Sequence, residues 1–248
     1  MNDSLGYRLK IGTIAPSTNT IVQPEFYSMQ PFGVTTHMSR IITPNVSLKS
    51  DEDFKAHIER MKSGMNAAID RVMTCKPDCL ANGLSLEAFW DGLEGSLNIV
   101  EKIENDYGIK CSMGNNAILE ALKVLNIKSK ISIITPHKPL GDKKVKEFFT
   151  EAGYEVIDFY SFNINKPAEI CHVSKAQLIK AIKIVSKKSP EAIIQVGTGL
   201  SMANLAANAW EWLGIPVIAI NTSIFWHALR MNNINDKIYG FGPLLENY

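Results

Sequence analysis

The stretch LKIGTIAPSTN, residues 9–19, indicates the architecture of the chain, because residues 129–139 repeat its pattern as SKISIITPHKP. In both, an apolar run of strand length ends at a proline and small polar residues, as where a strand enters a loop. A second pair, DCLANGLSL at residues 78–86 and AIIQVGTGLSM at residues 192–202, repeats similarly. The chain is therefore predicted to contain two similar halves.

Around these stretches, strand-length apolar runs alternate with helical patterns. We expect strands over residues 9–15, 34–41, 78–81, 109–112, 130–134, 154–160, 191–196 and 215–220. We expect helices over residues 51–73, 86–107, 115–125, 143–152, 175–187, 202–213 and 223–231. Such alternation predicts an α/β fold and excludes all-β and helix-bundle folds.

The repeat predicts two pseudo-symmetric, Rossmann-like halves, each a parallel sheet flanked by helices. No linker rich in Gly, Ser or Pro marks their boundary, so we expect the chain to cross in a helix and to return in its C-terminal helix. The first half is expected over residues 1–114 plus 221–248, and the second over residues 115–220. Open α/β sheets bind ligands at the carboxyl ends of their strands, so we expect a ligand cleft between the halves.

Composition narrows the classes of function. The chain has 248 residues, of which 46% are hydrophobic, enough for a sizeable core. A net charge of +1 without a basic cluster argues against nucleic-acid or membrane partners and is compatible with a homo-oligomer. The first residues lack a signal-peptide pattern, and no segment has the length and apolarity of a membrane span, so we expect a soluble, cytoplasmic protein.

The cysteines do not indicate a disulfide framework or a metal site. Cys75, Cys79, Cys111 and Cys171 are few and scattered, so they are expected to be reduced thiols. Cys75 and Cys79 form a C-x3-C pair, but no second pair or nearby histidine completes four ligands. We therefore expect no metal.

Two strand-end loops of the first half carry groups that bind anions. Residues 16–20 contain Pro16, Ser17, Thr18 and Asn19, whose polar side chains can cap the next helix or, with its backbone amides, hold an anionic oxygen. Residues 82–87 are NGLSLE, in which Gly83 allows close backbone approach and Ser85 follows Leu84. Glu87 is expected in the first helical turn, either as a partner of the helix dipole or, with a raised pKa, as a general base.

Two loops of the second half are their counterparts. His137 ends the strand that mirrors residues 9–15, where a histidine is either structural or catalytic. Gly197 and Gly199 flank Thr198, which suits amides aimed at an oxyanion, or simply a helix start that needs small residues. The sequence contains no P-loop, zinc-protease or nucleophile-elbow motif, and no dinucleotide-binding spacing.

Taken in order, these loops resemble the branch of the aspartate/glutamate racemase superfamily that holds maleate cis-trans isomerases and arylmalonate decarboxylases. The matching stretches are IGTIAPSTNT (11–20), GVTTHMSR (33–40), LSLEAFWDG (84–92), ITPH (134–137) and IPVIAINTSIFWHALR (215–230). The last stretch, which includes Asn221, is the most specific. The resemblance implies a cofactor-free enzyme that forms a carbanion or enediolate beside a bound carboxylate.

The chain departs from this family at its two catalytic cysteine positions. In the family, racemases use both thiols as acid and base, isomerases use one as a nucleophile, and arylmalonate decarboxylases keep only the second as proton donor. Here the first position falls on Gly83 and the second on Gly197 or Thr198. A histidine, His137, replaces the usual tyrosine. Two-thiol racemisation and thiol addition are therefore disfavoured.

The sequence thus predicts a cofactor-independent lyase or isomerase, decarboxylase-like, that acts on a small carboxylic or dicarboxylic acid. The catalytic candidates are Glu87, His137 and Thr198. The predicted substrate-binding residues are Pro16, Ser17, Thr18, Asn19, Gly83, Leu84, Ser85, Gly197, Gly199 and Asn221. The alternatives are an isomerase or racemase with a non-cysteine acid and base, a hydratase or hydrolase that activates water, and a carboxylate-binding protein without catalysis.

Overall fold

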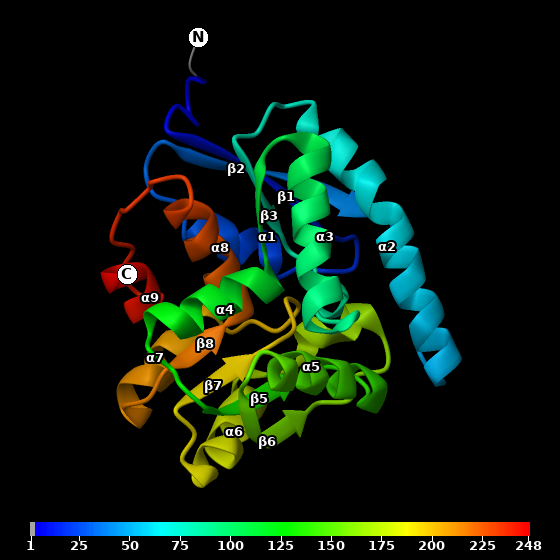
Figure 1. The fold of residues 1–248 in the computed structure, drawn as a ribbon, viewed down its shortest axis with the longest axis vertical. Helices are drawn as coiled ribbons and strands as arrows, with labels where there is room; N and C mark the ends of the chain where they lie inside the picture. Colours follow the sequence, from blue (N-terminus) through cyan, green and yellow to red (C-terminus); the bar gives the residue numbers. More distant parts are fainter. Residues whose placement is uncertain (1–2) are drawn as a thin grey trace.

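Two four-stranded parallel sheets form the framework of the computed structural model, which describes residues 3–248 (Figure 1). The first sheet has strand order β2-β1-β3-β4 and the second β6-β5-β7-β8. The strands of the first sheet are β1 Leu9–Pro16, β2 Val34–Ile41, β3 Cys79–Asn82 and β4 Lys110–Met113. Those of the second are β5 Lys130–Thr135, β6 Glu155–Ser161, β7 Ala192–Gln195 and β8 Val217–Ala219. Each strand of one sheet has a counterpart at the same place in the other, which confirms the predicted pseudo-symmetric α/β fold.

Helices cover the sheets. The α-helices are α1 Val22–Ser28, α2 Asp51–Met73, α3 Gly92–Tyr107, α4 Gly114–Val124, α5 Pro139–Glu151, α6 Lys175–Val185, α7 Ala203–Leu213, α8 Ile220–Arg230 and α9 Pro243–Asn247. The 3-10 turns are η1 Leu86–Ala88, η2 Pro167–His172 and η3 Ser186–Lys188. Three of these elements, α1, η2 and α9, were not among the helices expected from the sequence. Within the described residues, no helix is long and apolar enough to cross a membrane.

Local sequence explains where α2 begins. The Ser50 hydroxyl accepts a hydrogen bond from the Asp53 backbone amide, and the Asp53 carboxylate accepts one from the Ser50 amide. This capping box satisfies amides that would otherwise lack a partner at the helix start. The apolar side chains of α2 then face the first sheet.

The predicted helix over residues 86–107 is wrong at its start. A 3-10 turn, Leu86–Ala88, comes first, and α3 begins at Gly92, where φ is +72°. This backbone conformation favours glycine and redirects the chain before α3. Glu87 consequently lies in a buried turn between the halves, not in the first turn of an α-helix.

Helices α4 and α8 lie side by side where the chain crosses between the halves (Figure 1). Helix α8 leaves β8 of the second sheet and packs against β3 and β4 of the first. We propose the domain division expected from the sequence, residues 1–114 plus 221–248 and residues 115–220, because α8 returns to the first sheet.

Three buried phenylalanines join the halves beside the cleft. Phe89 follows η1, and Phe148 and Phe149 belong to α5. The ring centroid of Phe89 lies 4.9 Å from that of Phe148 and 5.8 Å from that of Phe149. One hydrophobic core therefore extends across both halves and anchors the turn that carries Glu87.

Phe148→Ala should lower the free energy of unfolding by about 3–5 kcal/mol, because it removes a fully buried ring and leaves a cavity. Chemical denaturation measures this loss. Tyr239→Ala is the control, since this side chain is 73% exposed and its removal should change stability by less than about 0.5 kcal/mol. Equal losses in the two variants would contradict the role assigned to the cluster.

Candidate active site

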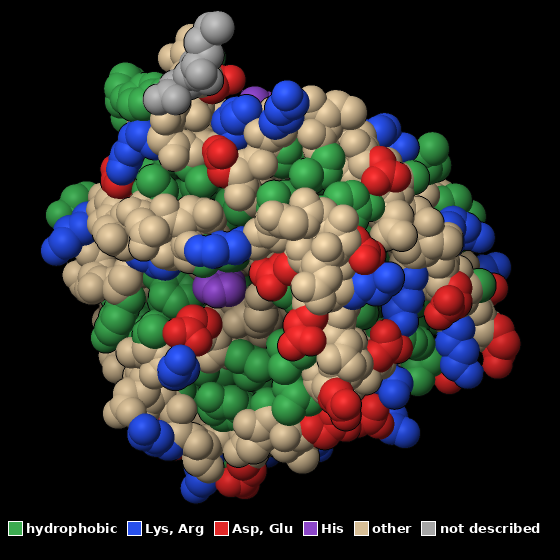
Figure 2. Space-filling view, turned by 45° about the horizontal axis from the view of Figure 1, so that its top comes forward, with side chains coloured by type: hydrophobic (Ala, Val, Ile, Leu, Met, Phe, Trp, Pro, Cys, Tyr) green, Lys and Arg blue, Asp and Glu red, His purple; other side chains and the backbone are tan. Residues whose placement is uncertain are grey.

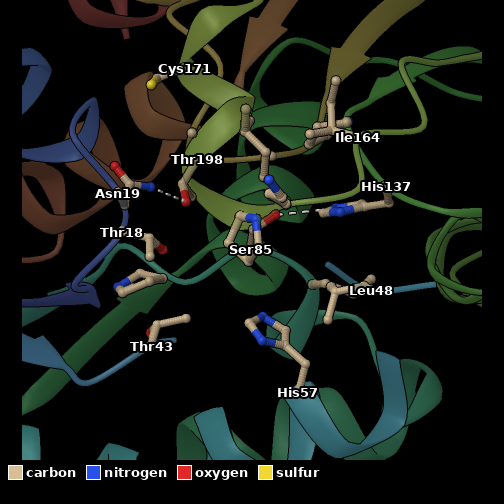
Figure 3. A pocket seen from close by; sticks show the side chains of 18 of the residues that line it. Thr18, Asn19, Thr43, Leu48, His57, Ser85, His137, Ile164, Cys171 and Thr198 are labelled. Atoms are coloured by element: carbon tan, nitrogen blue, oxygen red, sulfur yellow. Dashed lines mark hydrogen bonds between the residues drawn. The ribbon is translucent and has the colours of Figure 1, made fainter. Parts of the chain in front are cut away.

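The cavity between the halves lies at the carboxyl ends of β1, β3, β5 and β7 (Figure 3). The space between its walls is about 760 Å³, open solvent at the mouth included. Most predicted site residues line it: Pro16, Thr18, Asn19, Ser85, Glu87, His137, Gly197, Thr198 and Gly199. The tertiary structure thus brings together loops from both halves at the expected cleft.

Ser17, Gly83, Leu84 and Asn221 were predicted to bind substrate, but the structure places them outside the cavity wall. The Ser17 side chain is exposed, and its hydroxyl accepts a hydrogen bond from the Thr43 amide. Leu84 is fully buried in the core. These two residues support the loops that carry the wall.

Asn221 and Gly83 act on Thr198 instead. The Asn221 amide group donates to the Thr198 carbonyl at 3.0 Å and to the Glu25 carboxylate at 2.7 Å. The Gly83 carbonyl accepts the Thr198 hydroxyl at 3.0 Å. Both residues therefore hold the Thr198 loop in place from outside the cavity.

Asn19 links the two halves at the cavity. Its Oδ1 accepts hydrogen bonds from the amides of Ile21 and Val22 at the start of α1, at 2.9 and 3.0 Å. Its Nδ2 donates to Thr198 Oγ1 at 3.1 Å (Figure 3). Asn19 therefore caps a helix and lines the cavity at once. Because the Thr198 hydroxyl already donates its proton to Gly83, it is a poor candidate for the proton donor.

Ser85 and His137 form a hydrogen-bonded pair across the cavity wall, with 3.2 Å between Ser85 Oγ and His137 Nε2 (Figure 3). His137 is 8% exposed. Burial, with a smaller contribution from His57, lowers the pKa of His137 to about 3. The imidazole is therefore neutral near pH 7 and serves as a hydrogen-bonding group, not as a cation.

Glu87 is the buried acid of the cavity, with 5% of the residue exposed. Its Oε2 accepts a hydrogen bond from the Ser85 amide at 3.2 Å. Burial raises the pKa of the Glu87 carboxyl, because a charged carboxylate is poorly solvated there. A carboxyl that keeps its proton to higher pH than an exposed glutamate can deliver that proton to a bound molecule.

Gly83, at the first family thiol position, and Gly197, one of the two residues that can match the second, leave little room for a side chain. A Cβ at Gly83 would lie 2.7 Å from Val22 Cγ1. Gly197 has a φ of +127°, and a Cβ there would lie 2.4 Å from Pro136 Cδ. A cysteine at Gly83 would have to displace the Val22 side chain, and one at Gly197 would meet the Pro136 ring from a backbone conformation that favours glycine.

Several residues of the cavity wall were not identified from the sequence. They are Thr43, Leu48, Phe54, His57 and Ile58 of the first half and Ile164, Lys166, Ile170 and Cys171 of the second. Of these residues, only Phe54, His57 and Ile58 have a spacing that could have indicated a shared surface, because residues i, i+3 and i+4 lie on one helix face. Cys171 lies in η2, and Lys166 is the residue before it; no sequence pattern predicted this 3-10 turn.

The four thiols are free and differ in environment. Cys79 and Cys111 are buried in the core, and burial raises the pKa of Cys79 to about 12. Cys75 is exposed, and Cys171 lines the cavity. Among residues 3–248, no group of three His, Cys, Asp or Glu side chains is arranged to hold a metal ion.

The arylmalonate decarboxylase family model matches residues 47–245. The maleate isomerase of Alcaligenes faecalis is 25% identical over 253 residues, which cover 96% of each chain. The Nocardia farcinica maleate cis-trans isomerase bound to TRIS superposes with a TM-score of 0.85 at 18% identity, covering 96% of this chain and 98% of that one. A crystal structure of arylmalonate decarboxylase gives 0.73 at 18% identity, over 95% and 98% of the two chains.

The fold and these matches define an enzyme of the lyase and isomerase class within the Asp/Glu racemase superfamily. The chain belongs to the arylmalonate decarboxylase family. The branch of the superfamily expected from the sequence is therefore confirmed.

Cys171→Ser should keep at least half of the wild-type turnover, because Cys171 lies at neither position that matches a family thiol. Iodoacetamide should inhibit the wild type by filling the cavity at Cys171, and it should leave Cys171→Ser unaffected. Cys75→Ser, at an exposed thiol, is the matched control and should stay sensitive. A 100-fold loss of turnover in Cys171→Ser would instead make Cys171 a catalytic thiol.

Proposed function

We propose that the protein is a cofactor-independent decarboxylase of a small dicarboxylic acid, with Glu87 as proton donor in place of the family thiol. The observation that carries the proposal is a buried carboxyl on the wall of a cavity in which neither position that matches a family thiol holds a cysteine. Decarboxylation needs one proton donor, and Glu87 is available for it.

The reaction proceeds through an enediolate. The bond between the α-carbon and one carboxylate breaks, carbon dioxide leaves, and the electron pair delocalises onto the remaining carboxylate. Glu87 then donates its proton to the α-carbon and regains one from water. Most of the barrier comes from the negative charge that develops, so aimed hydrogen-bond donors lower it by about 3–4 kcal/mol each.

Neutral donors around the cavity form a cradle for that charge. Asn19 Nδ2 and the pair of Ser85 and His137 face it from both halves (Figure 3). Within residues 3–248, the backbone amides of Thr198 and Gly199 donate to no protein acceptor. Unpaired amides on a cavity wall are ready to bind an anionic oxygen.

Lys166 supports a substrate with two carboxylates. In the described part of the chain it is the only lysine or arginine on the cavity wall, and it pairs loosely with Glu169, with 3.5 Å between Nζ and Oε1. The histidines of the wall do not add positive charge near pH 7, since burial lowers the pKa of both His57 and His137. The negative charge of a second substrate carboxylate would be compensated by the Lys166 ammonium group if it lay beside Lys166, and by no positive side chain elsewhere on the described wall.

Isomerisation of a cis-unsaturated dicarboxylate is the second candidate. The 25% identity over nearly the whole length of a maleate isomerase favours it. Isomerisation by addition to the alkene needs a nucleophile, and among the described residues Cys171 is the only thiol on the cavity wall.

Turnover of malonate, 2-methylmalonate, 2-phenylmalonate and maleate in deuterium oxide tests both candidates by NMR. We expect at least one malonate to lose carbon dioxide and gain one deuterium on the α-carbon. Glu87→Gln should lower kcat about 100-fold or more with little change in Kd. Asn19→Ala should weaken binding by about 1.5–3 kcal/mol, because it removes a hydrogen bond to a charged oxygen.

Asn204→Ala is the control for Asn19→Ala, since Asn204 is exposed on α7 and should leave binding unchanged. Formation of fumarate from maleate without any decarboxylation would favour the second candidate. If the wild type transforms none of these acids, the proposed reaction is wrong.

The pH dependence of kcat separates Glu87 from His137. Burial raises the pKa of Glu87, and the protonated form is the donor, so kcat should fall as pH rises through that raised pKa. His137, with a pKa of about 3, does not change charge above about pH 5. Glu87→Gln should give a low and flat profile. A wild-type kcat that rises with pH would make the titrating group a base and contradict the assignment.

A further inference from the structure

His57 is a polar residue on the cavity wall that the proposed reaction does not use. Helix α2 presents Phe54, His57 and Ile58 to the cavity. Figure 3 shows the imidazole of His57 reaching from α2 into the cavity near Leu48, across from Asn19 and Thr198. It therefore faces a part of the ligand away from the Asn19 and Thr198 loops.

The α2 wall beside His57 is apolar, although His137 lies close enough for the two imidazoles to interact. Phe54 and Ile58 belong to the same helix face, and Leu48 and Leu86 line the cavity with them. The nearby Thr43 hydroxyl donates to the Ile41 carbonyl, so its proton is already used within the protein. His57 is left as the side chain that offers a polar contact from the α2 wall.

The hydrogen-bonding state of the ring determines what it offers. Within residues 3–248, the buried Nδ1 of His57 has no hydrogen-bond partner. A buried ring nitrogen without a hydrogen-bond partner costs less free energy as a bare lone pair than as an N–H group. We therefore place the proton of the neutral His57 ring on Nε2. Burial and Arg60 lower the pKa of His57, which keeps the ring neutral. The ring thus presents one N–H donor, at Nε2, from an apolar wall.

We propose that His57 selects substrates whose substituent on the carbon chain carries a hydrogen-bond acceptor, such as a hydroxyl or carbonyl oxygen. This inference rests on the proposed function for one point, that the cradle holds the carboxylates. A ligand with an apolar substituent leaves the His57 N–H unpaired after water has been displaced, and such a loss discriminates strongly between analogues.

Calorimetric titration with 2-hydroxysuccinate and 2-methylsuccinate tests the proposal on the full chain. The two acids are nearly isosteric and carry the same charge, so their contacts with the cradle and Lys166 cancel in the comparison. The wild type should bind the hydroxy acid about 10-fold more tightly or better. His57→Phe should abolish or reverse this preference, and His57→Gln, which restores an N–H donor, should retain it.

His172→Phe is the matched control, because His172 ends η2 beside the cavity but is exposed and does not line it. It should show the wild-type preference. Equal binding of the two acids to the wild type, or a hydroxyl preference that survives in His57→Phe, would overturn the proposal. Equal binding to the wild type overturns the proposal even if a variant fails to fold, and His57→Gln tests the assignment to His57 if His57→Phe does not fold.

Unsubstituted succinate separates this inference from the proposed function. If succinate binds and the hydroxyl preference is absent, the role of His57 is wrong while the cradle stands. If succinate and both substituted acids fail to bind, the cradle is wrong, and the inference about His57 falls with it.

Discussion

The hydrogen bonds that join Asn19, Thr198 and Gly83 are the contacts on which the site depends. They connect loops that follow β1, β7 and β3, and so they cross from one half to the other. Asn221 holds the same Thr198 loop from behind. These groups are buried, so a shift of one loop against the others inside the closed structure would leave them without partners, which is costly. The cavity therefore has one defined arrangement of donors before any ligand enters.

Burial then sets the chemistry of the groups around that arrangement. Glu87 and His137 scarcely meet solvent, so the ionised form of each is disfavoured: the pKa of Glu87 rises, and that of His137 falls. The outer surface differs, with Lys, Arg, Asp and Glu interspersed over the face in Figure 2. The same residue types are solvated charges outside and neutral hydrogen-bonding groups inside, where an anionic intermediate needs fixed donors.

Local sequence patterns predicted the strands of this protein better than they predicted its turns and the residues of the cavity wall. Strand ends were well placed, because a β-branched run followed by Pro or Gly is a local signal. The residues 86–107 were assigned one helix because their composition is helical, although the turn at Gly92 depends on how residues 86–91 pack between the halves. His57, Lys166 and Cys171 were missed since they lie on a helix, before a 3-10 turn and within it, not in strand-end loops.

The sequence by itself determined the two-fold repeat, the parallel sheets and the four loops that meet at the cleft, since these follow from local periodicity and from the rule that parallel strands end at one edge. It also indicated that neither family thiol position holds a cysteine, since the first falls on Gly83 and the second on Gly197 or Thr198. Three properties emerge only in the folded chain: Gly83 and Gly197 leave little room for a Cβ, Glu87 is buried, and His57 faces the cavity. These properties arise from contacts between segments far apart in the chain, which no local pattern encodes.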